Sequence, residues 1–174
     1  MDDKQVEFLV KEAQAVFSIA MRVGYAGGIG KIQKTTIPGI PGSKCITWQS
    51  IDGRWKVVDT YVVNRESFDS SGMTVIAFEG APIWVMHYGG FYKDEAIPFL
   101  KKCLAAAYKA SLFNGGRGPQ EMREGNLRYS NLSSGGTFRL FEGKESIEDM
   151  RDEGPVLGVH WYRGGMLLTH LRPE

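Results

Sequence analysis

The chain carries one segment twice, and this repetition constrains its fold more than any other sequence feature. Each copy starts with an acidic residue and a glycine, continues through an apolar stretch to a histidine, and ends at two glycines; the copies are residues 79–90 and 153–165. An acidic residue followed by glycine favours a turn, and the apolar stretch has the length of one strand. The repetition predicts antiparallel hairpins and a candidate pocket near His87 and His160, but it identifies no reaction.

The length and the charge of the chain limit the classes of protein to consider. A chain of 174 residues is long enough for a single domain over residues 1–174 with a sizeable core. A net charge of +1 gives no strong electrostatic signal for nucleic acid or an anionic membrane. The start, Met1-Asp2-Asp3-Lys4, is acidic where a signal peptide is basic, and no apolar run approaches the ~20 residues of a membrane span. We therefore expect a cytoplasmic protein without nucleic-acid or membrane partners.

Two segments have the apolar spacing of helices. Residues 3–23 place apolar side chains three, four and seven positions apart, Asp2 or Asp3 can cap the start, and Gly24 follows the end. Residues 94–113 form the second expected helix, with Asp94 as its cap, Pro98 in its first turn and two glycines after it. Its expected buried stripe consists of Ile97, Leu100, Leu104, Ala107, Tyr108 and Leu112.

The remaining apolar runs are short and are separated by turn residues, which is typical of strands. Asp52-Gly53 and Glu79-Gly80 predict two tight hairpins. Residues 114–125 are expected to form a polar loop, and residues 144–152 fit either a strand or a helical turn. Short connections favour antiparallel pairing, so we expect an α+β fold: a curved antiparallel sheet of about seven to nine strands with an N-terminal and a central helix. The expected strands are residues 45–50, 55–63, 73–78, 83–88, 127–131, 137–141, 147–151, 156–162 and 166–170.

The spacing of the residues does not match several familiar functional motifs. The glycine-rich residues 24–31 have five residues between Gly24 and Gly30, and Ile follows Lys31, so a phosphate-binding Walker loop is excluded. The two cysteines form no CxxC pair, and Cys103 is expected to be a buried thiol. Residues 114–119 fit an anion-binding loop less well than a helix stop, because a helix C-terminus repels anions. The acidic residues between 142 and 149 are interpreted as a solvated turn.

The candidate site combines aromatic, acidic and histidine side chains on the expected strands. Asp59 lies on the apolar face of its strand, where an ionised carboxylate needs a donor. A His87–His160–Asp59 metal cluster and plain core packing are both open, although a core-facing Leu157 would direct His160 and Tyr162 away from the core. We expect no metal and no cofactor. The residues of the candidate pocket are Tyr25, Asp59, Tyr61, Trp84, His87, Tyr88, His160 and Tyr162.

Four segments in the same order resemble a known family. They are Tyr25-Ala26-Gly27-Gly28, Asp59-Thr60-Tyr61, residues 80–90 and residues 141–147. Together they resemble a bacterial and archaeal domain of unknown function, often attached to helix-turn-helix domains of predicted transcriptional regulators, over residues 8–168. We expect no DNA-reading domain within residues 1–174. At the start of the third expected strand, Gly72-Met73-Thr74 stands where the family pattern has a more acidic sequence. The resemblance implies a regulatory setting and no catalytic residue.

Three functions remain open from the sequence. The first is a non-enzymatic small-ligand-binding or regulatory module that uses the candidate pocket. The second is a hydrolase or isomerase that uses His87 or His160 with Asp59. The third is a homodimeric interaction module that pairs through sheet edges or through residues 36–44.

Overall fold

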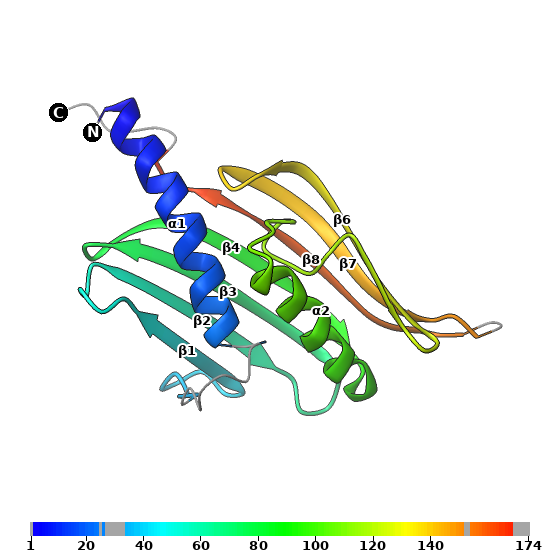
Figure 1. The fold of residues 1–174 in the computed structure, drawn as a ribbon. Helices are drawn as coiled ribbons and strands as arrows, with labels where there is room; N and C mark the ends of the chain where they lie inside the picture. Colours follow the sequence, from blue (N-terminus) through cyan, green and yellow to red (C-terminus); the bar gives the residue numbers. More distant parts are fainter. Residues whose placement is uncertain (1, 25, 27–33, 152–153, 169–174) are drawn as a thin grey trace.

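A computed structural model describes residues 2–24, 26, 34–151 and 154–168 of the chain. It contains one eight-stranded antiparallel sheet with both helices on the same face (Figure 1). This confirms the predicted α+β class with an N-terminal and a central helix. The strands are β1 (Ser43–Gln49), β2 (Trp55–Val63), β3 (Asp69–Phe78), β4 (Ala81–Tyr92), β5 (Glu121–Glu124), β6 (Leu127–Thr137), β7 (Leu140–Asp149) and β8 (Val156–Met166).

The sheet consists of two four-stranded meanders that meet at their last strands. The strand order is β1-β2-β3-β4-β8-β7-β6-β5, so β4 and β8 are adjacent at the centre. These two strands carry the repeated sequence segments, and Tyr88 lies directly opposite Tyr162 in their antiparallel register. Each meander follows one helix in the chain, which explains why the sequence repeats itself on the scale of half the fold.

Helix α1 (Asp3–Val23) forms where the sequence predicts it. The Asp2 side chain accepts a hydrogen bond from the Gln5 backbone N–H at 2.8 Å, and the Gln5 side chain accepts one from the Asp2 N–H at 3.0 Å. This reciprocal capping box satisfies two of the free amide groups at the helix start. The predicted apolar face packs on the sheet and α2, and its residues Val6, Leu9, Val10, Ala13, Phe17, Ala20 and Met21 are all buried. Val16, which was outside the predicted face, is buried as well.

The central helix is shorter than predicted. A 3-10 turn, η1 (Asp94–Ala96), precedes α2 (Ile97–Lys109), and no side chain caps either start, so the predicted Asp94 cap is wrong. The chain leaves the helix at Ala110 and turns at Ser111, which has a φ of 53°. This turn leaves Leu112 exposed instead of in the buried stripe, and it places Phe113 edge-on against the core rings of Phe17, Phe138 and Phe141.

The strands of the C-terminal half are longer than predicted, and the predicted strand at residues 166–170 lies partly outside the described residues. Residues 127–131 and 137–141 belong to β6 and β7, which turn at residues 138–139, and residues 144–149 are strand rather than helical turn. The supposed polar loop contains β5. Glycines inside the strands explain the error, because they accommodate large rings instead of breaking the strands. A Cβ on Gly143 would lie 2.3 Å from the Tyr162 hydroxyl, and a Cβ on Gly158 would lie 2.0 Å from Cδ1 of Tyr92.

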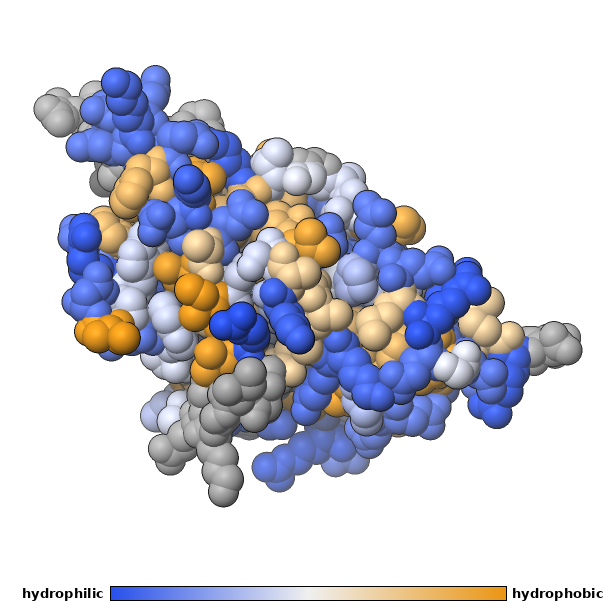
Figure 2. Space-filling model, in the orientation of Figure 1, coloured by the Kyte–Doolittle hydropathy of each residue, from blue (hydrophilic) through white to orange (hydrophobic). Residues whose placement is uncertain are grey.

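An aromatic cluster forms the core between the helices and the sheet. Trp84 is fully buried, stacks on Phe138 with ring centroids 4.9 Å apart, and donates its Nε1–H to the Phe138 carbonyl at 3.0 Å. Phe17 of α1 packs against the same indole ring at 5.2 Å. The outside of this helical face mixes hydrophilic and hydrophobic patches (Figure 2), and Phe8 and Ile19 are exposed apolar side chains of α1.

Candidate functional site

A cavity of about 570 Å³ lies between the helices and the inner face of the sheet. Its walls combine the end of α1, α2, strands β2 to β4, and the segment that joins β2 to β3. Arg117 and His160 reach it from the C-terminal half of the chain. Its size falls within the range of pockets that hold small molecules. The buried and half-buried side chains that carry its chemistry are Asp59, Tyr61, Ser70, Tyr88, Tyr92, Tyr108, Arg117 and His160.

Asp59 faces the cavity from β2 and is only 5% exposed. Its Oδ1 accepts hydrogen bonds from the Thr74 hydroxyl and from the Tyr88 hydroxyl, each at 2.8 Å. Burial raises the pKa of the Asp59 carboxyl, and these two donors oppose the shift by stabilising the charged form. Burial and the nearby Asp59 also raise the pKa of Tyr61 to about 12, so this tyrosine stays neutral.

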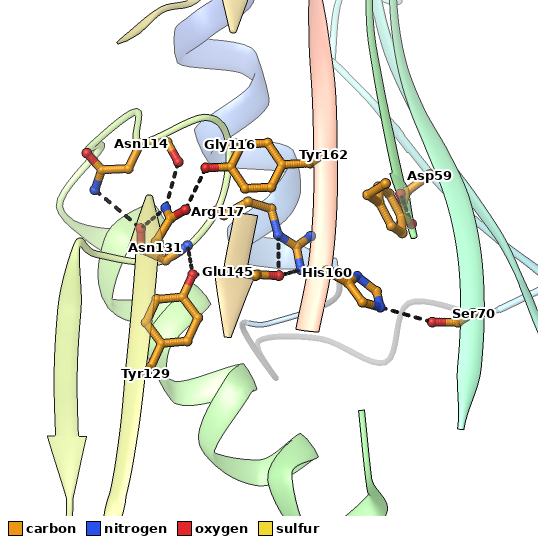
Figure 3. A network of polar contacts seen from close by, with 12 residues as sticks. Asp59, Ser70, Asn114, Gly116, Arg117, Tyr129, Asn131, Glu145, His160 and Tyr162 are labelled. Atoms are coloured by element: carbon orange, nitrogen blue, oxygen red, sulfur yellow. Dashed lines mark hydrogen bonds and ion pairs between the residues drawn. The ribbon is translucent and has the colours of Figure 1, made fainter. Parts of the chain in front are cut away.

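His160 enters the same cavity from β8. Its Nε2 lies 3.2 Å from the Ser70 hydroxyl (Figure 3). Its ring packs against Tyr92 with centroids 4.5 Å apart and, more loosely, against Tyr88 at 6.1 Å. Burial, together with the positive charge of Arg117, lowers the pKa of His160 to about 4, so the imidazole is neutral near pH 7. The Nδ1 atom of His160 and the hydroxyl of Tyr92 are buried without a hydrogen-bond partner among the described residues.

A buried ion pair lies beside the cavity. Arg117 Nε donates to Glu145 Oε1 at 2.7 Å, and the Tyr129 hydroxyl donates to Glu145 Oε2 at 2.5 Å (Figure 3). Burial alone would raise the pKa of Glu145, but the adjacent Arg117 charge and the Arg117 and Tyr129 hydrogen bonds lower it, so the carboxylate is ionised. The Arg117 guanidinium also lies 5.4 Å from the centre of the Tyr88 ring, which links the ion pair to the Asp59 side of the cavity.

The loop before β5 directs Arg117 inward. Gly115 and Gly116 have φ values of 64° and 71°, a backbone shape that side chains with a Cβ rarely adopt. Asn131 secures the loop by donating to the carbonyls of Asn114 at 2.9 Å and Gly118 at 3.1 Å. Residues 114–118 are thus a tightly packed turn that positions a buried cation.

The structure brings together half of the predicted pocket residues. Asp59, Tyr61, Tyr88 and His160 line the cavity. Tyr162 is buried next to it and donates its hydroxyl to Asn131 Oδ1 at 2.5 Å. Trp84 belongs to the aromatic core, and Tyr25 lies outside the described residues.

His87 was predicted to line the pocket, but the structure places it outside the cavity. It is exposed and alternates along β4 with the inward-facing Met86 and Tyr88, so it lies on the opposite face of the sheet. A cluster of His87, His160 and Asp59, one of the two interpretations left open by the sequence, is therefore excluded. His160 and Tyr162 are buried and Trp161 is 61% exposed, although Leu157 is buried too, so the alternation predicted from Leu157 does not hold along β8. Within the described residues, no three His, Cys, Asp or Glu side chains gather closely enough to hold a metal ion.

Sequence reasoning missed the polar half of the site. The sequence predicts a solvated turn at Glu145, but this side chain is fully buried. The signal was alternation along β7: Phe141, Glu145 and Ile147 occupy alternate positions on one buried face. Arg117 had no such signal, because its direction depends on the backbone of the preceding glycine turn.

The family that matches the sequence is described as a domain of unknown function (DUF5680), and the match covers residues 59–167. This is more than half of the chain, so the chain belongs to that family. The match starts within β2 and is shorter than the predicted resemblance over residues 8–168. No curated protein and no solved structure matches the sequence. None of the helices in the described parts of the chain is long and apolar enough to span a membrane.

Proposed function

We propose that this member of the DUF5680 family is a non-enzymatic module that binds a small organic ligand in the cavity between α2 and the sheet. The observation that carries the proposal is the cavity itself. It is about 570 Å³ in volume, it has tyrosine side chains on several walls, and it contains a few fixed polar groups. Apolar walls with a small number of oriented polar groups are typical of small-molecule sites. A regulatory role fits the predicted association of such domains with helix-turn-helix regulators.

A matched pair of variants on β3 tests the proposal. Ser70 lines the cavity, whereas its neighbour Ser71 lies on the opposite face of the sheet. Ser70→Phe should fill the cavity and abolish ligand-induced stabilisation, while Ser71→Phe should preserve it. The measurement is thermal unfolding of the wild type and both variants against a library of metabolites at millimolar concentration. The proposal fails if no compound stabilises the wild type, or if Ser70→Phe leaves the stabilisation intact.

A hydrolase or isomerase is the second candidate, and one observation favours it: His160 and Asp59 line the same cavity. Their hydrogen bonds run to different partners, His160 to Ser70 and Asp59 to Thr74 and Tyr88. A histidine with a pKa of about 4 is a weak base near neutral pH, which places this candidate second. Conversion of a bound compound by the wild type, with loss of turnover in His160→Gln, would place it first.

Homodimerisation through the sheet edges stays a prediction. The two edge strands are β1 and β5. Strand β5 has four residues, of which Glu121, Arg123 and Glu124 are charged, and short charged edges disfavour pairing between chains. Light scattering at micromolar concentration tests the prediction, and a monomeric mass would remove it.

A further inference from the structure

The opening of the cavity carries more positive than negative charge. Of the residues that the structure describes, four exposed cations line it, Lys34, Lys44, Arg65 and Lys101, against two exposed acids, Glu66 and Asp94. The Lys34 and Lys44 ammonium groups each lie 5.8 Å from the centre of the Tyr61 ring, so two cations flank this aromatic side chain. Such an excess attracts anions and raises their local concentration at the opening.

The inner wall of the cavity presents flat rings and unused polar atoms. The rings of Tyr88, Tyr92 and His160 pack on one another there. The Tyr92 hydroxyl and His160 Nδ1 have no hydrogen-bond partner among the described residues, although Tyr92 is 6% and His160 4% exposed. Buried polar groups in folded proteins nearly always have a partner, so each of these two atoms is a candidate contact for a polar atom of a ligand. The Tyr92 hydroxyl also lies close to Glu145 and Arg117.

Asp59 does not compete for this position. Its Oδ1 accepts hydrogen bonds from Thr74 and Tyr88, and the guanidinium of Arg117 lies 5.4 Å from the centre of the Tyr88 ring. The Arg117 charge is itself compensated by Glu145, so the charge that a ligand can neutralise lies at the opening of the cavity.

We propose, building on the ligand-binding function above, that the cavity takes a small aromatic anion. The flat ring lies among the tyrosines, the acidic group stays at the opening near Lys34 and Lys44, and a polar substituent at the far end of the ring reaches the Tyr92 hydroxyl and His160 Nδ1. A free aromatic acid and a nucleoside monophosphate share this chemistry, and the probes below separate them.

Isothermal titration calorimetry on the full chain at pH 7.5 and low salt tests the charge. The probes are 4-hydroxybenzoate, its neutral analogue 4-hydroxybenzamide, its cationic analogue 4-hydroxybenzylamine, and uridine monophosphate. We expect an anion, either the benzoate or the nucleotide, to bind at least about tenfold more tightly than the amide and the amine, with affinity that falls as salt is added. Lys44→Gln should weaken the anion about three- to tenfold without affecting the amide, and Lys109→Gln, an exposed cation outside the cavity, should change neither.

A second comparison tests the orientation. Tyr92→Phe removes a hydroxyl that has no direct hydrogen bond among the described residues but lies close to Glu145 and Arg117, so the unfolding midpoint of the variant is measured first. In the folded variant 4-hydroxybenzoate should bind about fivefold or more weakly, while benzoate binds as before. Equal losses for both acids would overturn the orientation. Binding of the amide or the amine as tightly as the anions would overturn the charge preference while leaving the ligand-binding function intact. The inference also fails if none of the probes binds but the metabolite screen finds another stabilising compound. If the screen too finds none, the proposed function fails with it.

Discussion

We expect removal of the buried ion pair between Arg117 and Glu145 to lower the free energy of unfolding substantially. Glu145 is fully buried and the Arg117 side chain is 7% exposed, so Glu145→Gln leaves a buried guanidinium without a counter-charge. Breaking such a pair typically costs about 3–5 kcal/mol, a large part of the ~5–15 kcal/mol that stabilises a domain. With a urea m-value of about 2 kcal/mol/M, the unfolding midpoint should fall by about 2 M.

Glu148 is the matched control for this prediction. It lies three residues along β7 and pairs with Arg128, but both side chains are about one-third exposed. Because solvent screens such pairs, Glu148→Gln should cost no more than about 1 kcal/mol. Replacing the buried pair together, as Arg117→Met with Glu145→Leu, should recover most of the loss, since no lone charge remains. Equilibrium urea unfolding followed by circular dichroism gives all three values, and equal costs for Glu145→Gln and Glu148→Gln would refute the reasoning.

Three further changes have defined outcomes. Asp59→Asn should lower the free energy of unfolding by about 1–3 kcal/mol in urea titrations, because the Thr74 and Tyr88 hydroxyls lose a charged acceptor; unchanged stability with loss of ligand binding would make Asp59 a functional residue. The pKa of His160 is about 4 in the folded chain against 6.5 for a free side chain, so the unfolded state binds the extra proton between these values. The unfolding free energy should therefore decrease as pH falls from 6.5 to 4, by up to about 3 kcal/mol, and His160→Gln should show a flatter profile. Gly158→Ala should destabilise the fold by about 1–3 kcal/mol in thermal unfolding, because its Cβ would overlap the Tyr92 ring, and an alanine variant as stable as the parent would contradict this packing.

The sequence predicted the elements that depend on local chemistry. Helix α1 and the hairpins at Asp52-Gly53 and Glu79-Gly80 follow from capping, apolar spacing and turn residues, and all three appear in the structure. The inward direction of Asp59 followed from alternation along β2, which is regular. These features depend only on residues that are close together in the sequence.

The errors have two physical origins, an extra residue in the second repeated segment and contacts between distant segments. His87 directly precedes Tyr88, whereas Trp161 separates His160 from Tyr162; because Tyr88 and Tyr162 lie opposite one another, the extra residue sends the two histidines to opposite faces. Irregular pairing occurs beside both strands, between Ile76 and Ala77 on β3 and between Ile147 and Glu148 on β7. Such shifts of register depend on how strands pack together, so the spacing within one strand does not reveal them.

The meeting of the two meanders at β4 and β8 has a consequence for biosynthesis. One edge of β4 pairs with β3, which precedes it in the chain. The other edge pairs with β8, so it stays unpaired until residues 156–166 have left the ribosome. An unpaired edge in an apolar strand is a template for pairing with other chains. A nascent chain interrupted before residue 156 would expose this edge at what becomes the middle of the sheet. Strand β8, the last strand of the sheet to be translated, thus pairs with β4 at the centre of the sheet. In the folded protein the β4 edge of the first meander and the β8 edge of the second protect each other from pairing with other chains.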